Sequence, residues 1–188
     1  MDIRTIDQAF LNGFDHYLRS DKNCANNYAV KNIRNLGKIL LICLENDWID
    51  KSLFTAYKGK TKNVDRFYLN KEELLQITGK EFASEGLNQV RDVFIFCCFT
   101  GLAYVDVFRL KQENIRNGID GERLIVTNRQ KTKTRSSVPL VPTAVSIIDR
   151  HAINKLCLNK GSLLPVPSNQ KRNEYLKEIA DLCGIEKN

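Results

Sequence analysis

The feature that most constrains the fold is an apolar segment, VFIFCCF, at residues 93–99. It ends a helix predicted over about 86–99, and its lack of a polar side indicates a helix buried on every face. The segment is far shorter than the roughly 20 apolar residues needed to cross a bilayer. Thr100-Gly101 interrupts the helix, and a short helix is predicted to follow through about residue 109. The segment therefore predicts a deeply buried helix.

The N-terminal third of the chain has apolar residues at helical spacing, which predicts helices over about 6–20 and 26–47. The stripe of the first helix contains Ile6, Ala9, Phe10, Gly13, Phe14, Tyr17 and Leu18. The stripe of the second contains Ile33, Leu36, Leu40, Cys43 and Leu44, and the opposite side carries the cations Lys31, Arg34 and Lys38. A further short piece is predicted near 53–57. These elements predict a small helical bundle with a cationic face.

Residues 57–66, YKGKTKNVDR, have no periodicity and contain two turn-forming residues, which predicts a linker. Its lysines are Lys58, Lys60 and Lys62, with Asp65 as its single acid. We therefore expect a domain boundary here, with one domain over 1–62 and a second over 63–188.

The second domain is predicted to be mainly helical with a small antiparallel sheet. Asn70 is the expected N-cap of a helix over 71–78, and helices are also predicted over 142–157 and 169–183. The β-branched segments 124–128 and 136–140 predict two strands joined by a hairpin. The fold class is thus mainly α with a small β-sheet.

The charge distribution predicts a polyanionic partner. The 188 residues include 29 Lys and Arg against 22 Asp and Glu, for a net charge of +7. Residues 109–135 alone contain eight cations and three acids. Cations on a helix face, a linker and a hairpin suit a protein that grips a phosphate backbone between two domains joined by a flexible linker. The simpler alternative is that these side chains are only solvated surface.

The six cysteines occur at positions 24, 43, 97, 98, 157 and 183, without a Cys-x-x-Cys pair or a nearby histidine. Cys43, Cys97 and Cys98 lie in apolar helical patterns, which indicates small buried side chains in a reducing compartment, and the spacing predicts no zinc or other metal site. The N-terminal sequence MDIRTIDQAF is too polar for a signal peptide. The sequence thus predicts a cytoplasmic protein that needs no cofactor.

Two motifs carry a resemblance to a known family. FCCFTGLAYVDVFRL, followed at a suitable distance by RQKTKTRSSVPLVP, is similar to the tyrosine recombinases of the phage integrase family. The similarity is greatest to the integrases of conjugative transposons and related mobile elements. It implies that residues 1–62 form a helical, SAM-like core-binding domain that clamps DNA. Residues 63–188 would form the N-terminal part of an α+β catalytic domain.

The family's reaction implies roles for particular residues. A tyrosine attacks a DNA phosphate to give a 3′-phosphotyrosine, and a lysine on the hairpin protonates the leaving 5′-oxygen. Lys131 matches that lysine, with Lys133 as the alternative assignment. The resemblance also implies double-stranded DNA as the partner, a homotetramer assembled on DNA for a full-length protein, and no membrane association. The residues expected to contact DNA are Lys31, Arg34, Lys38, Lys58, Lys60, Lys62, Lys133 and Arg135.

The sequence departs from the family pattern at Ala103, where the first catalytic arginine is usual. Either a nearby cation replaces that arginine, or the protein binds DNA and cuts poorly. The candidate replacements are Arg91, Arg109 and Arg135. Asp106 matches an acidic position that helps to fix the turn, which is a structural role.

The family's second arginine, in a His-x-x-Arg box, and its nucleophilic tyrosine have no match near the end of the chain. The sequence is therefore expected to be truncated before that box and to be inactive alone. HYLR at 16–19 is a chance match in the first helix, and Tyr175 and His151 are expected to be structural.

Two other functions are consistent with part of the sequence. Residues 86–110 could act as the helix-turn-helix of a non-catalytic DNA-binding regulator, although the second helix offers few polar base-reading residues. A protein-interaction domain with incidental charge is the other alternative. The salt dependence of DNA binding distinguishes the protein-interaction domain from the recombinase and from the helix-turn-helix regulator, because a surface that binds phosphates must bind DNA more weakly as salt rises.

Overall fold

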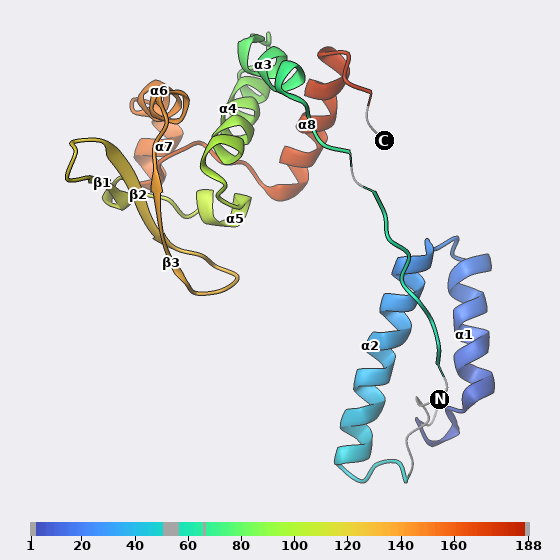
Figure 1. Ribbon diagram of the computed structural model, residues 1–188. Coiled ribbons are helices and arrows are strands. Elements are labelled where there is room, and N and C mark those ends of the chain that lie inside the picture. The colour runs from blue at the N-terminus through green and yellow to red at the C-terminus, as the bar shows by residue number, and fades with distance from the viewer. Residues whose placement is uncertain (1–2, 51–56, 66, 187–188) are drawn as a thin grey trace. The chain divides into compact units, whose positions relative to one another are not determined.

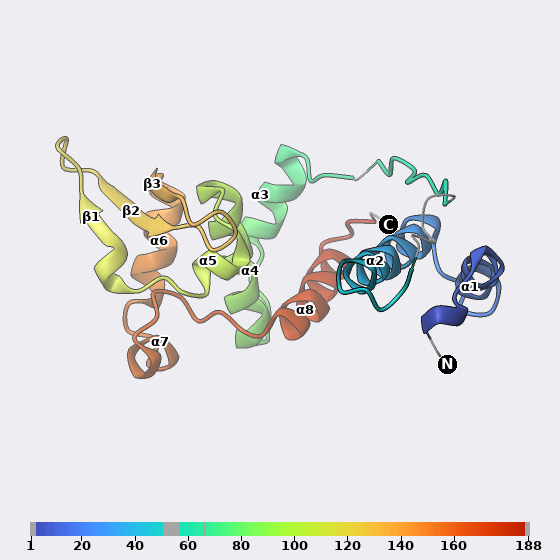
Figure 2. The ribbon, with the colours of Figure 1, turned by 90° about the horizontal axis from the view of Figure 1, so that it is seen from below.

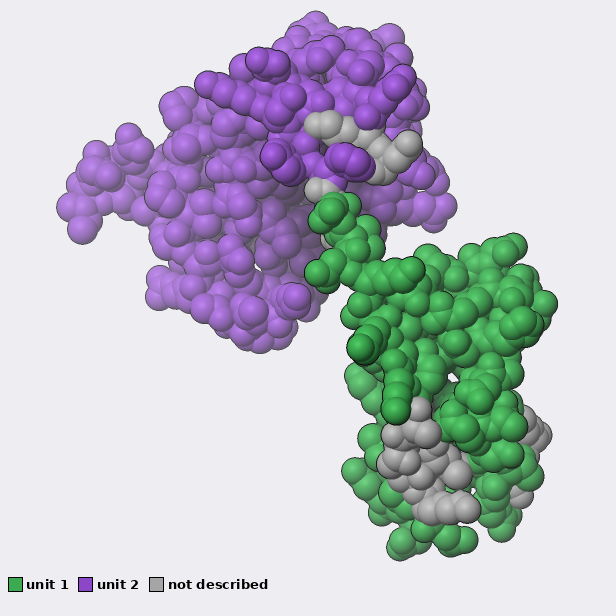
Figure 3. Space-filling view, turned by 45° about the vertical axis from the view of Figure 1, so that its right-hand side comes forward, with its two compact units in different colours: residues 1–66 green, residues 67–188 purple. Residues whose placement is uncertain are grey.

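The structure is a computed structural model that describes residues 3–50, 57–65 and 67–186. The chain divides into two compact units, residues 1–66 and 67–188, which we call unit 1 and unit 2 (Figure 3). Each unit has its own buried side chains and is described by itself.

Unit 1 is built on two long helices, α1 (Gln8–Ser20) and α2 (Asn26–Glu45), preceded by the short 3-10 helix Ile3–Thr5 (Figure 1). The side chain of Asp7 begins α1 by accepting a hydrogen bond from the Phe10 N–H at 2.8 Å. Both helices predicted from the sequence are confirmed, with ends that differ by about two residues. The predicted piece near 53–57 lies outside the described residues except for Tyr57, which is not helical.

The apolar stripe predicted on α2 is confirmed, because Ile33, Leu40 and Cys43 are buried. The stripe predicted on α1 is partly wrong. Tyr17 is 42% exposed, whereas Leu11, which was not in the stripe, is fully buried. Leu11 and Leu18 are seven residues apart and face α2 together, so the buried side of α1 is rotated away from Tyr17.

Unit 2 is mainly helical. Its helices are α3 (Lys71–Gly79), α4 (Glu85–Thr100), α5 (Tyr104–Val107), α6 (Pro142–His151), α7 (Lys155–Lys160) and α8 (Asn169–Leu182), with the 3-10 helix η2 (Gln112–Asn114) after α5. The predicted N-cap of α3 is confirmed: Asn70 accepts from the Glu73 N–H, and the Glu73 carboxylate accepts from the Asn70 N–H.

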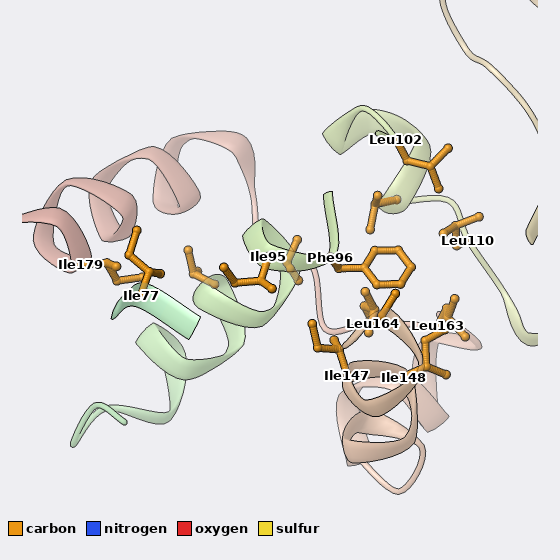
Figure 4. Close-up of a cluster of buried hydrophobic side chains, with 14 of the residues drawn as sticks. Ile77, Ile95, Phe96, Leu102, Leu110, Ile147, Ile148, Leu163, Leu164 and Ile179 are labelled. Carbon is orange, nitrogen blue, oxygen red and sulfur yellow. The ribbon is translucent and has the colours of Figure 1, made fainter. Parts of the chain in front are cut away.

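The core of unit 2 surrounds α4, which lies between α6 and α8 (Figure 2). Ile77 of α3 and Ile179 of α8 lie near one part of the helix, while Leu163 and Leu164 lie near Phe96 (Figure 4). The Phe96 side chain is completely buried. The middle of the apolar segment 93–99, at Ile95 and Phe96, is deeply buried in this core, as the sequence predicted. Its end is not: Phe99 is 37% exposed and Cys98 is exposed, so the prediction that Cys98 is buried is wrong.

The interruption after α4 has a conformational cause. Gly101 has φ 64°, a left-handed conformation that favours glycine, and its N–H donates to the Cys97 carbonyl at 2.9 Å. The Thr100 hydroxyl donates back to the Phe96 carbonyl at 2.7 Å. These bonds satisfy the end of α4 and let α5 begin within three residues.

The sheet has three antiparallel strands in the order β1-β2-β3, namely β1 (Ile115–Asn117), β2 (Arg123–Asn128) and β3 (Arg135–Pro139). The two predicted strands are confirmed as β2 and β3, and Asn128 pairs with Arg135 next to the hairpin turn. β1 was not predicted from the sequence, because a strand of three residues has no alternating pattern to detect.

The helix predicted over 142–157 is wrong, because the chain forms two helices there. α6 ends at His151 and α7 begins at Lys155. The Asn154 side chain accepts from the Leu156 N–H at 2.9 Å and so begins a new helix.

Candidate nucleic-acid interface

The cations predicted on α2 lie on its exposed face. Lys31, Arg34 and Lys38 are all exposed, opposite the buried Ile33 and Leu40. The same face also presents apolar side chains, with Tyr28 58% and Ile39 57% exposed. The face is thus amphipathic rather than uniformly charged.

The described part of the predicted linker, residues 57–65, is here called the strap. It belongs to unit 1, and Lys58, Lys60 and Lys62 are exposed along it. The Arg34 guanidinium donates to the Gly59 carbonyl at 3.2 Å, which places a cation of α2 beside the strap. This part of the predicted linker is therefore hydrogen-bonded to α2 through the backbone of Gly59, Lys60 and Lys62.

In unit 2, the turn between β2 and β3 covers residues 129–134. The Arg129 N–H donates to the Thr134 carbonyl at 2.9 Å, and the Lys133 N–H donates to the Arg129 carbonyl at 2.8 Å. Lys133 has φ 57°, so it occupies a left-handed position without being glycine. Lys131 and Lys133 are both exposed on this turn.

Asp106 connects α5 to this turn. Its side chain is buried, and its Oδ1 accepts a hydrogen bond from the Gln130 N–H at 2.8 Å. Asp106 has a structural role as predicted, but it fixes the β2–β3 turn, 24 residues away. Because the buried Asp106 carboxylate accepts a hydrogen bond from the Gln130 N–H, the beginning of the turn is held in place.

The Gln130 side chain contacts two cations of this region. Its Oε1 accepts from the Arg109 guanidinium and also lies 3.4 Å from the Lys133 ammonium. The role of Gln130 was not predicted from the sequence, because a glutamine in a charged turn carries no periodic signal.

A hollow of about 470 Å³ lies beside the turn. It is lined by Arg109, Asn114, Val126, Thr127, Asn128 and Arg135. Two arginines and no acidic residue line it, so an anion entering the hollow meets guanidinium donors without an opposing carboxylate in the lining.

Ala103 precedes α5 and is exposed, and its methyl group supplies no donor. Among the three candidate replacements, Arg91 is excluded. It is only 5% exposed, pairs with Asp92 at 2.8 Å and donates to the Lys80 carbonyl. Arg109 and Arg135 remain, and they share the hollow described above.

A buried ionic cluster lies elsewhere in unit 2, around Asp92 of α4. Its carboxylate accepts from Arg91 at 2.9 Å, from Arg150 at 3.0 Å and from His151 at 2.9 Å. Burial by itself raises the pKa of Asp92, but the His151 hydrogen bond and the two arginine charges outweigh burial and lower that pKa. The structural role expected for His151 is confirmed, because its ring is buried in this cluster.

Tyr175 packs against the unit 2 core, as the sequence predicted. A Cβ on Gly86 would lie 2.8 Å from its ring, so α4 and α8 approach closely at this point. In residues 3–50, 57–65 and 67–186, no helix is both long enough and apolar enough to span a bilayer.

Comparisons with known proteins agree with this architecture. Residues 1–61 match the family model of the phage integrase SAM-like domain. No curated protein sequence matches the chain.

Several solved structures have the same fold over nearly all of the chain. A lambda integrase dimer bound to a COC′ core site has a TM-score of 0.77 and 14% identity, covering 99% of this chain and 66% of its own. XerH site-specific recombinase bound to a palindromic difH substrate has a TM-score of 0.66 and 19% identity, covering 99% and 56%. The Tn1549 transposon integrase in complex with a circular intermediate DNA has a TM-score of 0.61 and 14% identity, covering 81% and 53%.

The chain therefore has the fold of these integrases and site-specific recombinases. It spans between 53% and 66% of the length of the three solved chains. The family-model match to the phage integrase SAM-like domain is confined to residues 1–61. The resemblance to the tyrosine recombinases agrees with the family-model match over residues 1–61 and, at the level of the fold, with these solved structures.

Proposed function

We propose that this chain is the DNA-binding and partly catalytic portion of a site-specific recombinase that integrates a mobile element through a 3′-phosphotyrosine intermediate. The observation that carries the proposal is the hollow shared by Arg109 and Arg135, next to the turn that presents Lys131 and Lys133. The likeness to integrases solved with DNA supports it at the level of the fold.

The chemistry of phosphoryl transfer explains why this arrangement suits the reaction. Negative charge builds on the phosphate oxygens in the transition state, and fixed guanidinium donors stabilise it. Arg109 or Arg135 would thereby supply the charge that Ala103 cannot. Lys131, exposed on the turn, would donate a proton to the leaving 5′-oxygen.

In unit 1, the exposed cations of α2 and of the strap are proposed to bind the phosphate backbone. Such contacts fix position and register and do not read base sequence. The apolar and polar side chains between them, Tyr28 and Asn35, are available for contacts with sugars or bases.

The alternative of a helix-turn-helix regulator is not favoured by the structure. The helix that would read the major groove, α5, has only four residues, and two of them are buried. The preceding helix, α4, is the centre of the core and offers little surface.

The proposal is tested by measuring the affinity of the 188-residue chain for a fluorescent DNA duplex. Arg109→Ala combined with Arg135→Ala should raise the Kd by roughly tenfold or more, since two phosphate contacts are lost. Arg116→Ala is the matched control, because Arg116 is an exposed arginine of β1 outside the hollow. An equal change in Kd for the control and the double variant would remove the hollow from the proposed interface.

A further inference from the structure

The strap is held against α2 by side-chain hydrogen bonds to its backbone. The Asn27 amide makes two of them: its Nδ2 donates to the Lys62 carbonyl, and its Oδ1 accepts from the Lys62 N–H, each at 2.7 Å. The Asn26 Nδ2 donates to the Lys60 carbonyl at 3.0 Å. Asn27 thus satisfies both backbone polar groups of Lys62, as a neighbouring strand would.

The beginning of the strap is also fixed. The Tyr57 ring packs against the buried cluster of Leu18, Ala29 and Ile33, and burial raises the pKa of its hydroxyl. Gly59 passes close to that ring, since a Cβ at this position would lie 2.3 Å from it. The strap is therefore held at its beginning by the packing of Tyr57 and further along by the hydrogen bonds to Lys60 and Lys62.

This arrangement orients the lysines of the strap. The carbonyls of Lys60 and Lys62 both face the start of α2, as expected of an extended segment in which alternate residues face the same way. The backbone carbonyls of both lysines are bonded to α2, and both lysine side chains are exposed. The Arg34 bond to Gly59 brings the charges of α2 next to them.

We propose that Asn27 is a positioning residue that orders the strap before any ligand binds, so that its lysines and the cations of α2 form one preformed surface for a nucleic-acid phosphate backbone. The proposal rests on the DNA binding proposed above. A disordered strap would lose conformational freedom on binding, and a docked strap has already lost it. Asn27 acts through the backbone of Lys62 and need not contact DNA itself.

The first arm of the test measures docking without DNA. In the 188-residue chain, Asn27→Ala should accelerate hydrogen exchange of the Lys62 amide by roughly tenfold or more, because its acceptor is lost. Asn12→Ala is the matched control, an exposed asparagine on α1 whose partner is Gln8. Exchange at Lys62 that is equally fast in the parent and in Asn27→Ala would overturn the proposal.

The second arm separates positioning from charge. Asn27→Ala should raise the Kd for duplex DNA by roughly three- to tenfold and leave the slope of log Kd against log salt unchanged. Lys62→Ala should reduce that slope by about 0.9, the value expected for one phosphate contact. When Lys62 is already alanine, Asn27→Ala should have a smaller effect, because one of the lysines it positions is gone.

The outcomes distinguish this proposal from the function on which it rests. Faster exchange at Lys62 with an unchanged Kd overturns the positioning role and leaves the proposed DNA binding intact. A parent chain whose Kd does not respond to salt overturns the DNA binding, and the positioning role with it, even if exchange at Lys62 shows that the strap is docked.

Discussion

The Asp92 carboxylate accepts a hydrogen bond from His151 Nε2 at 2.9 Å, and both side chains are about 5% exposed or less. The bond joins α4 to the end of α6 across 59 residues of sequence. With Arg91 and Arg150 on the same carboxylate, Asp92 is the centre of a buried ionic cluster in unit 2.

Replacing Asp92 should destabilise unit 2 strongly. Asp92→Ala leaves Arg91 and His151 buried without their acceptor, and breaking a buried pair in this way costs about 3–5 kcal/mol. Urea unfolding followed by circular dichroism measures the loss. Asp149→Ala is the control, because its pair with Arg123 is exposed and such pairs contribute about 0–1 kcal/mol. Equal losses for the two variants would show that the cluster is not a stabilising feature.

The same carboxylate should make stability depend on pH in the acid range. Its folded pKa is lowered from the ordinary value of 3.8, so its contribution is fully present above that value. The contribution is lost as the pH falls from about 4 through the lowered pKa. Asp92→Asn should therefore flatten the dependence of the unfolding free energy on pH below about 4, relative to the parent. Parallel profiles for parent and variant would contradict the lowered pKa.

Gly101 should be intolerant of substitution for backbone reasons alone. A Cβ there would meet no heavy atom within 4 Å, but φ is +64°, which costs an alanine about 1–2 kcal/mol. Gly79→Ala is the control in the same unit, with the same open space and no positive φ. Thermal melts should show a lower Tm for Gly101→Ala only. A Tm for Gly101→Ala that matches the parent would show that the left-handed turn after α4 is unimportant.

On the α2 face, Lys31→Ala together with Arg34→Ala should weaken DNA binding and leave the Tm nearly unchanged, since both side chains are exposed. The loss of two phosphate contacts should reduce the salt slope by about 1.8. Lys177→Ala on the exposed side of α8 serves as the control. Unaltered affinity of the double variant would remove α2 from the interface.

On the turn, Lys131→Ala should slow DNA cleavage without weakening binding, when the chain is part of a protein that also supplies the nucleophilic tyrosine. Loss of a general acid costs roughly 10²- to 10⁴-fold in rate. Single-turnover cleavage and a separate binding titration measure the two effects. If Lys133→Ala slows cleavage and Lys131→Ala does not, the general acid is Lys133.

Local patterns in the sequence were sufficient to predict much of the fold. The apolar run around Phe96, the break at Gly101 and the cap at Asn70 are each encoded within a few neighbouring residues, and the structure confirms them. The break at Asn154 was encoded in the same way, because asparagine is a strong N-cap, but the apolar periodicity on either side concealed it.

The missed features depend on pairs that are far apart in the sequence. Asp92 with His151, Asp106 with Gln130 and Asn27 with Lys62 are 59, 24 and 35 residues apart. Each pair joins polar residues whose spacing has no helical or strand period. Their pairing follows only from how helices, turn and strap pack together in three dimensions, so the docking of the strap and the exclusion of Arg91 could not be predicted from the sequence.

The most direct test of the account is the salt dependence of binding between the 188-residue chain and a DNA duplex of arbitrary sequence. If six or more of the proposed cations neutralise phosphates, affinity should fall by roughly 10³-fold or more between 50 and 200 mM salt. A Kd that stays constant across that range would contradict the account, because no phosphate-binding surface could then include the cations of α2, the strap and the β2–β3 turn.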